Sequence, residues 1–273
     1  MQNQSFKASV PTAGQCRLCH GPLQPLFKST LLRKYEVDYF KCTECHSLQT
    51  EPPYWLDEAY GKNLSSLDTG AAQRNIHNWA ACSFISRLFA VKNVIDMGGG
   101  DGLLCRLLRD HGLNCYVKDR YASPNYAQGF TDPDFETPDL VLGFEVMEHF
   151  ANPAEDLEDI FKYKSRFVLL STELYAGQTK EWWYLTPDSG QHIFFYSQQA
   201  IELIANKHGY SFVVSGGFIL FFRNDVSSIK RIFANILLKA RICRLLKPLV
   251  VMLPCPGVGA DYVRHTEKIK KVG

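Results

Sequence analysis

The sequence predicts an α/β protein with a doubly wound, mostly parallel sheet that ends in an antiparallel hairpin, preceded by a small cysteine-rich module. Short apolar runs alternate with helical patterns through the middle of the 273-residue chain. Such alternation favours parallel strands joined by right-handed crossovers. A final pair of β-rich runs flanks Gly216-Gly217, which is the pattern of a hairpin. Four cysteines in two matched pairs mark the module.

Four strands of the parallel part are expected where the runs are short, apolar and rich in β-branched or aromatic residues. These runs are Asn93 to Met97, Asn114 to Lys118, Asp139 to Phe144 and Arg166 to Ser171. The two hairpin strands are expected at Ser211 to Ser215 and at Phe218 to Phe222. Because the first four runs do not alternate with polar residues, they indicate buried strands.

Three helices of the same region are predicted from their end signals. Leu103 to His111 follows a glycine-rich turn and stops at Gly112, a C-terminal cap signal. Asn152 is expected to cap a second helix, with Pro153 at its first position. Ser197 is expected to cap a third helix, which ends at Gly209.

Composition divides the chain into three expected regions: a module over residues 1–53, an α/β domain over 54–225 and a basic, apolar tail over 226–273. Apolar residues make up 46% and charged residues 21%, as in ordinary globular proteins. The formal net charge of +2 gives no strong nucleic-acid signal. No signal peptide and no membrane span is expected, so the predicted location is cytoplasmic.

The cysteine-rich module contains two C-x2-C pairs separated by 22 residues. The four cysteines are Cys16, Cys19, Cys42 and Cys45. Two such pairs supply the four thiolates of a tetrahedral Zn²⁺ site, so we predict a zinc ribbon whose intervening loop forms a hairpin around Leu31 to Phe40. The alternative is four unrelated free cysteines. His20 and His46 follow each pair and could replace a ligand, although four cysteines already close a structural site.

A glycine-rich loop lies between the first expected strand and the helix after it, in the segment VIDMGGGDGLL. Glycines allow a sharp turn and the close approach of a ligand, and the helix start offers free N–H groups. The residues expected at the ligand are Asp96, Gly98, Gly100 and Asp101. The two carboxylates would repel a pyrophosphate and suit a cationic ligand. Asp119 closes the next strand at the position of a ribose-binding acid.

With these features the chain resembles the class I S-adenosylmethionine-dependent methyltransferases. The segment GFEVMEHFANP, Gly143 to Pro153, is similar to the fourth strand and following loop of that family. The segments DTGAAQRN, Asp68 to Asn75, and WWYLTPDSGQHIFFYS, Trp182 to Ser197, are similar to a bacterial subgroup associated with sugar and surface-polysaccharide metabolism. That subgroup often carries an N-terminal zinc module.

The resemblance implies S-adenosylmethionine as the cofactor and assigns roles to individual residues. Asp96, Gly98, Gly100 and Asp119 would hold the cofactor. Phe144 and Glu145 would lie beside the reacting groups, and Arg74 could reach the cofactor carboxylate.

The residues expected to handle the acceptor follow the fourth strand and fill the aromatic segment before Ser197. Candidate general bases are Glu145, Glu148, His149, Tyr184 and His192. We expect His192 to act at the acceptor, because it lies in a loop dense in aromatic residues after the last parallel strand. His149 is as readily explained as a structural histidine, and much of the aromatic density as core or lid.

The basic tail is expected to form one amphipathic helix from Val226 to Pro248, ended by that proline together with Pro254 and Pro256. Basic residues interleave with an apolar stripe formed by Ile229, Ile232, Phe233, Ile236, Ala240 and Cys243. The helix either packs on the domain or on a second subunit, or makes a weak contact with an anionic membrane surface. The oligomeric state is not predicted.

The sequence therefore predicts a methyltransferase acting on a small polar acceptor, such as a nucleotide-linked sugar or a surface glycan. The alternative is an RNA methyltransferase that uses the zinc ribbon as its nucleic-acid reader. A third hypothesis is a non-catalytic binding module on the same fold. The methylated atom of the acceptor, whether O, N or C, stays open.

Overall fold

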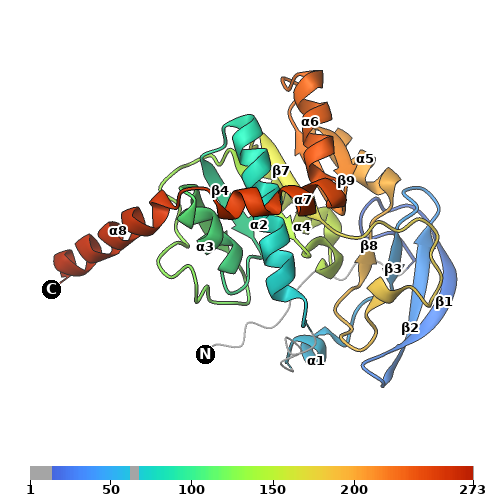
Figure 1. Cartoon of the computed structure of the whole chain (residues 1–273). Helices are drawn as coiled ribbons and strands as arrows, with labels where there is room; N and C mark the ends of the chain where they lie inside the picture. Colours follow the sequence, from blue (N-terminus) through green and yellow to red (C-terminus); the bar gives the residue numbers. More distant parts are fainter. Residues whose placement is uncertain (1–13, 62–67, 273) are drawn as a thin grey trace. The chain divides into compact units, whose positions relative to one another are not determined.

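The computed structural model of the chain describes residues 14–61 and 68–272 (Figure 1). It divides into two compact units, each assembled from three segments of the sequence. Unit 1 comprises Met1–Thr69, Glu145–Lys162 and Thr172–Gly209, and unit 2 comprises Gly70–Phe144, Tyr163–Ser171 and Tyr210–Gly273. The chain leaves unit 2 twice at the carboxyl end of a strand, after Phe144 and after Ser171.

Unit 2 contains a six-stranded sheet in the order β5-β4-β6-β7-β10-β9. The strands are β4 Asn93–Met97, β5 Asn114–Lys118, β6 Leu140–Phe144, β7 Phe167–Ser171, β9 Ser211–Ser215 and β10 Phe218–Phe222. The first four are parallel, and β10 runs antiparallel to both β7 and β9. The predicted doubly wound sheet with a terminal hairpin is confirmed, with strand bounds that differ from the expected ones by at most one residue.

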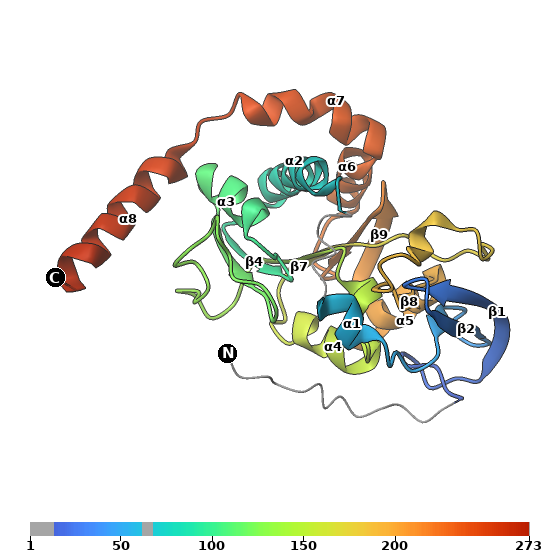
Figure 2. The same cartoon turned by 90° about the horizontal axis from the view of Figure 1, so that it is seen from below.

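Helices α2 (Ala71–Phe89) and α3 (Leu103–Asp110) lie over the same face of this sheet (Figure 2). Their buried side chains join those of the parallel strands and of β10 in one apolar core. Gly216 and Gly217 both have positive φ, +61° and +84°, which is the backbone that a two-residue hairpin turn requires. The glycines of the turn and the burial of β10 in the core therefore both support an antiparallel hairpin at the end of the sheet.

The C-terminal region forms three helices, α6 (Ser228–Leu238), α7 (Ala240–Val251) and α8 (Pro256–Val272). The predicted single helix ending at Pro248 is wrong. The helical backbone breaks at Lys239, which has an extended ψ of 126°, and Pro248 lies inside α7. Pro256 begins α8, where a missing N–H leaves no helical bond unmade.

The expected apolar stripe of the tail is also placed differently. Ile229, Ile232 and Phe233 are 67%, 60% and 53% exposed, whereas Ala234 and Leu238 on the same helix are buried. Ala234 and Leu238 are therefore the residues by which α6 joins the apolar core of unit 2. Within the described part of the chain no single helix has the length and hydropathy to cross a membrane, and one bent pair, Ala240–Val251 with Pro256–Glu267, meets that test by length and composition.

Unit 1 contains a four-stranded antiparallel sheet in the order β1-β2-β3-β8. The strands are β1 Leu23–Leu31, β2 Tyr35–Cys42, β3 Leu48–Thr50 and β8 Phe194–Phe195. The hairpin expected between the cysteine pairs is β1–β2. The fourth strand comes from the aromatic segment, more than 140 residues further along the chain, since Leu48 pairs with Phe195.

The remaining elements of unit 1 are short helices: α1 Leu56–Gly61, α4 Pro153–Phe161 and α5 Gln198–His208, with 3₁₀ turns η2 Met147–His149 and η3 Trp183–Leu185. Ser197 caps α5 as predicted, accepting a hydrogen bond from the Ala200 N–H at 3.0 Å, and Gly209 ends the helix with a left-handed backbone. Asn152 precedes α4 without a side-chain cap bond. One apolar core, including Trp55, Tyr184 and Phe195, joins the cysteine-rich sheet to the aromatic segment.

Candidate active site

The glycine loop of unit 2 joins the end of β4 to the start of α3. Gly98, Gly100 and Gly102 have φ values of +69°, +54° and +77°, in the left-handed region that side chains disfavour. At Gly99 a Cβ would lie 2.5 Å from Asp96 Oδ2. The backbone course of this loop therefore requires glycine at each of these positions.

The loop lies at the switch point of the sheet. From β4 the chain moves to β5 on one side and then to β6 on the other, so the crossovers diverge at this position. In open α/β sheets, ligands bind in the crevice that such divergence leaves at the carboxyl ends of the strands. The topology thus places the predicted cofactor residues where this fold binds small molecules.

Two carboxylates border the loop. Asp119 is held by the main chain: its Oδ2 accepts from Gly100 N–H at 2.9 Å, and its Oδ1 accepts from the N–H groups of Tyr121 and Ala122 at 2.7 and 2.8 Å. A carboxylate offers about four lone pairs, so these three bonds leave Asp119 able to accept another. The structure brings Asp119 and Gly100 together as the sequence suggested.

Asp96 has the opposite environment. Its side chain is 2% exposed, and Oδ2 has no hydrogen-bond partner. Burial, and then the charge of Asp119, raise the pKa of Asp96 to about 7. An ionised carboxylate that is buried, close to a second acid and without a hydrogen-bond partner on Oδ2 destabilises the folded chain unless a cation compensates its charge.

This cost gives a testable expectation for the cofactor-free chain. An unfolded aspartate titrates near its ordinary value of 3.8 and the folded Asp96 near 7, so the carboxyl removes stability progressively as the pH rises between these values. We expect Asp96→Asn to raise the free energy of unfolding at pH 8 and to change it little at pH 4, as measured by urea denaturation. The control is Asp132→Asn, at an exposed carboxylate. No gain at pH 8 would contradict the expectation.

The other predicted cofactor residues surround the loop less closely. Phe144 ends β6, next to β4, and packs edge-on against Phe218 at 5.8 Å between ring centroids. Asp101 is exposed and accepts a hydrogen bond from the Asn125 side chain at 3.4 Å. Arg74 lies exposed in the first turn of α2. The structure therefore unites Asp96, Gly98, Gly100 and Asp119 around one turn.

The acceptor candidates of unit 1 form a buried polar cluster around Tyr184. Its hydroxyl donates to Glu148 Oε1 at 2.7 Å and lies 3.3 Å from Glu145 Oε2 and 3.2 Å from Thr172 Oγ1. Burial, and then the charges of Glu148 and Glu145, raise the pKa of Tyr184 well above its ordinary value. Tyr184 is thus a hydrogen-bond donor in this site rather than a base.

Both predicted histidines belong to the same cluster. Their ring centroids are 5.0 Å apart, and His192 Nε2 is 3.9 Å from Glu148 Oε1. Burial and the neighbouring His192 lower the pKa of His149 to about 3. His149 therefore stays neutral throughout the physiological pH range.

The sequence offered all five residues, Glu145, Glu148, His149, Tyr184 and His192, as separate candidate bases, and the structure brings them into one cluster. Glu148 is fully buried and touches both Tyr184 and His192. Thr172 and Tyr60 were missed; the Tyr60 hydroxyl lies 3.2 Å from His149 Nδ1. Thr172 directly follows the end of β7, a position that marks ligand-facing residues in such sheets.

The four cysteines of unit 1 come together. All four sulfur atoms lie within 4.8 Å of one another, with 3.6 Å between Cys16 and Cys45 and 3.5 Å between Cys19 and Cys42. Thiolates bound tetrahedrally to Zn²⁺ at about 2.3 Å are separated by about 3.8 Å. The cluster is therefore compatible with a zinc ion, as the sequence predicts.

A doubly wound sheet that ends in an antiparallel hairpin, with a glycine loop and two acids at its switch point, defines the class I methyltransferase fold. A family model described as a methyltransferase domain matches residues 72–215, more than half of the chain. The chain belongs to this family and is an S-adenosylmethionine-dependent methyltransferase.

Solved structures with a similar backbone include three methyltransferases. Magnesium protoporphyrin IX methyltransferase from Synechocystis PCC 6803 is 16% identical, with a TM-score of 0.40 over 62% of this chain and 93% of that one. An O-methyltransferase family protein from Burkholderia thailandensis is 13% identical, with a TM-score of 0.44 over 57% of each chain. The plantazolicin methyltransferase is 13% identical, with a TM-score of 0.45 over 62% and 94%. No curated protein matches the chain.

Proposed function

We propose that this methyltransferase binds S-adenosylmethionine at the glycine loop of unit 2 and methylates a small polar acceptor, a nucleotide-linked sugar or a surface glycan. The observation that carries the proposal is the buried, unpaired carboxylate of Asp96 beside that loop. S-adenosylmethionine carries a sulfonium and an ammonium group, so its cationic end compensates the charge. The pyrophosphate of a dinucleotide would be repelled by Asp96 and Asp101.

The residues of the loop fit this cofactor. A Cβ built on Gly100 meets no atom within 4 Å, so the main chain there borders open space that a ligand can enter. Asp96 would hold the ammonium group, Asp119 would accept hydrogen bonds from the ribose hydroxyls, and Arg74 would reach the carboxylate. When bound, the cofactor supplies a methyl group on a good leaving group, so alignment of the acceptor provides much of the catalysis.

Acceptor recognition is assigned to unit 1. Glu145 directly follows Phe144, the last residue of β6, so the first acceptor candidate stands at the carboxyl end of a central strand. Around the polar cluster of unit 1, Trp182 lies 5.4 Å from Tyr184 and 5.5 Å from Phe195 between ring centroids. Aromatic walls with convergent polar groups suit sugars.

The test is incubation of the chain with S-adenosylmethionine labelled on its methyl group and a panel of nucleotide sugars, glycans and RNA. Transfer to a sugar or glycan is expected. Transfer to RNA, with binding that weakens steeply as salt rises, would replace the proposal by the RNA alternative. Cofactor binding without transfer to any acceptor would favour the binding-module hypothesis.

Zn²⁺ is proposed as the resident ion of the four cysteines, in a structural role. Four thiolates close the coordination shell and leave no position for a substrate. Cys42 lies at the end of β2, and Cys45 immediately precedes the segment that leads into β3. An ion here would therefore fix the sheet that β8 of the aromatic segment completes.

Cofactor affinity is expected to depend on Asp119. Hydrogen bonds to a charged group contribute about 1.5–3 kcal/mol net, which corresponds to roughly one to two orders of magnitude in affinity. Asp119→Ala should weaken S-adenosylmethionine by that factor in titration calorimetry, whereas the exposed Asp132→Ala should not. Unchanged affinity in Asp119→Ala would remove this residue from the site.

A further inference from the structure

A second group of potential metal ligands lies in unit 1, separate from the four cysteines. It consists of Glu148, His149 and His192, and one ligand atom of each lies within 4.8 Å of the others. The first two belong to the 3₁₀ turn η2, and His192 lies two positions before the first residue of β8. The backbone pairing of Ile193 N–H with the Glu148 carbonyl at 2.9 Å holds these two segments together.

The hydrogen bonds of the two histidines determine which ring nitrogen is available. His192 Nδ1 lies 2.7 Å from the Tyr184 carbonyl oxygen, and His149 Nδ1 lies 3.1 Å from the Gln191 carbonyl oxygen. A carbonyl only accepts hydrogen bonds, so each Nδ1 that bonds to one carries the hydrogen and each neutral ring keeps a lone pair on Nε2. The Tyr60 hydroxyl, 3.2 Å from His149 Nδ1, is then an acceptor in this contact. This is the arrangement of metal-binding histidines, whose second nitrogen donates to a fixed acceptor.

Glu148 supplies the anionic member of the group. Its side chain is fully buried; Oε1 accepts from the Tyr184 hydroxyl, and Oε2 has no hydrogen-bond partner. His192 Nε2, 3.9 Å from Oε1, is too distant to satisfy the carboxylate by a hydrogen bond. A buried carboxylate with an unpartnered oxygen is costly, and a cation among these three side chains would remove that cost.

We propose that Glu148, His149 and His192 bind one divalent transition-metal ion. Two imidazoles and one carboxylate are the donor set of catalytic zinc and of non-haem iron(II) sites, which keep open positions for a substrate. Ligands at about 2.0–2.2 Å from an ion are separated by about 3.0–3.5 Å, so the three groups move together by roughly 1 Å on binding.

The ion has a role at the acceptor, and this part of the inference rests on the proposed function. An acceptor oxygen at an open position of the ion would have its pKa lowered, which favours loss of its proton as the methyl group arrives. His192 is then a metal ligand rather than the general base expected from the sequence. Tyr184 becomes a positioning residue, because its hydroxyl orients the Glu148 carboxylate.

The experiment is titration with Mn²⁺ of the full chain carrying one Zn²⁺, at the four cysteines, followed by electron paramagnetic resonance and without cofactor or acceptor. Mn²⁺ is chosen because it prefers carboxylate oxygen to the thiolates of the cysteine site and therefore leaves that zinc in place. One bound Mn²⁺ per chain is expected. Glu148→Gln and His192→Asn should weaken it by at least about 100-fold, and Tyr184→Phe by about 10–100-fold.

His208→Asn is the matched control. His208 Nε2 is also 3.9 Å from a glutamate oxygen, that of Glu158, but this glutamate is 53% exposed. The control should keep the Mn²⁺ affinity of the unaltered chain. Near-ultraviolet circular dichroism reports whether unit 1 of each variant is folded, and binding of S-adenosylmethionine to unit 2 tests the proposed function independently.

Two results would overturn the inference: no uptake of Mn²⁺ or Co²⁺ by the unaltered chain, or uptake that persists in Glu148→Gln and His192→Asn. Because neither result involves the cofactor, failure of the metal site is distinguishable from failure of the methyltransferase proposal.

Discussion

Replacement of Cys42 by serine is expected to release zinc and to unfold the β1–β2–β3 sheet of unit 1. Structural zinc in small modules contributes apparent binding free energies of about 10–16 kcal/mol at neutral pH, and removal of one thiolate forfeits most of this. Cys42 is fully buried at the end of β2, with its sulfur 3.5 Å from that of Cys19. Because the position is closed to solvent, a water molecule cannot replace the thiolate that Cys42→Ser removes. Elemental analysis should find one zinc per unaltered chain and none in Cys42→Ser.

The damage should extend beyond the first 53 residues, because β8 pairs with β3 and the aromatic segment shares the core of unit 1. Hydrogen exchange should therefore increase in residues 182–197 as well as in the cysteine-rich strands. Binding of S-adenosylmethionine should largely survive, since the glycine loop belongs to unit 2. Cys255→Ser, at an exposed cysteine outside the cluster, should change neither property. Zinc retained in Cys42→Ser, or absent from the unaltered chain, would contradict the prediction.

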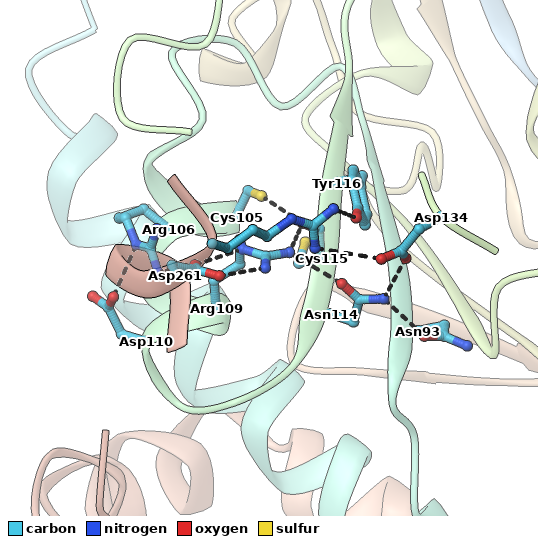
Figure 3. Close-up of polar contacts among 11 residues, drawn as sticks. Asn93, Cys105, Arg106, Arg109, Asp110, Asn114, Cys115, Tyr116, Asp134 and Asp261 are labelled. Carbon is cyan, nitrogen blue, oxygen red and sulfur yellow. Dashed lines mark hydrogen bonds and ion pairs between the residues drawn. The ribbon is translucent and has the colours of Figure 1, made fainter. Parts of the chain in front are cut away.

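The second large effect is expected at Asp261, which anchors α8 to α3. Arg109 donates to both carboxylate oxygens of Asp261, at 2.8 and 2.6 Å, and Arg106 donates to one of them at 2.7 Å (Figure 3). Both Arg109 and Asp261 are buried. Burial by itself would raise the pKa of Asp261, but the hydrogen bonds from the two arginines lower it below its ordinary value.

Asp261→Ala leaves the buried guanidinium of Arg109 without its anion. Breaking a buried ion pair in this way costs about 3–5 kcal/mol, which we expect as a loss in the free energy of unfolding measured with urea. Arg109 retains the Cys115 carbonyl, the Asn114 side chain and the rings of Phe130 and Tyr116, none of which carries a net charge. Hydrogen exchange should also increase in α8.

Asp110→Ala is the matched control. It removes the (i, i+4) partner of Arg106, whose side chain is 23% exposed, and such pairs contribute only about 0.3–0.5 kcal/mol. Since the lowered pKa of Asp261 contributes stability only above the pH at which the carboxylate ionises, the difference between Asp261→Ala and the unaltered chain should shrink as the pH falls below 4. A loss below 1 kcal/mol at neutral pH would show that α8 does not depend on this pair.

The sequence predicted the sheet of unit 2 well, because its signals are local. Apolar runs define strands β4 to β7 by burial, and Gly216-Gly217 permits the positive φ of the hairpin turn. The tail was predicted poorly for the same reason. Ile229, Ile232 and Phe233 have the spacing of one helix face, yet their side chains are exposed. The local sequence does not determine which face of a helix packs against another element.

By itself, the sequence determined the features that depend on the residue and its immediate neighbours: the glycine loop, whose positive φ values exclude side chains, and the pairing of cysteines within each C-x2-C turn. The tertiary structure decided the features that depend on residues distant in the chain. Residues 48 and 195 share a sheet, Arg109 and Asp261 share a buried ion pair, and Glu148 meets His192 across more than 40 residues. Such contacts form because whole helices and strands bury their apolar surfaces against one another. The free energy of this burial depends on pairs of distant elements, so it cannot be read from either element alone.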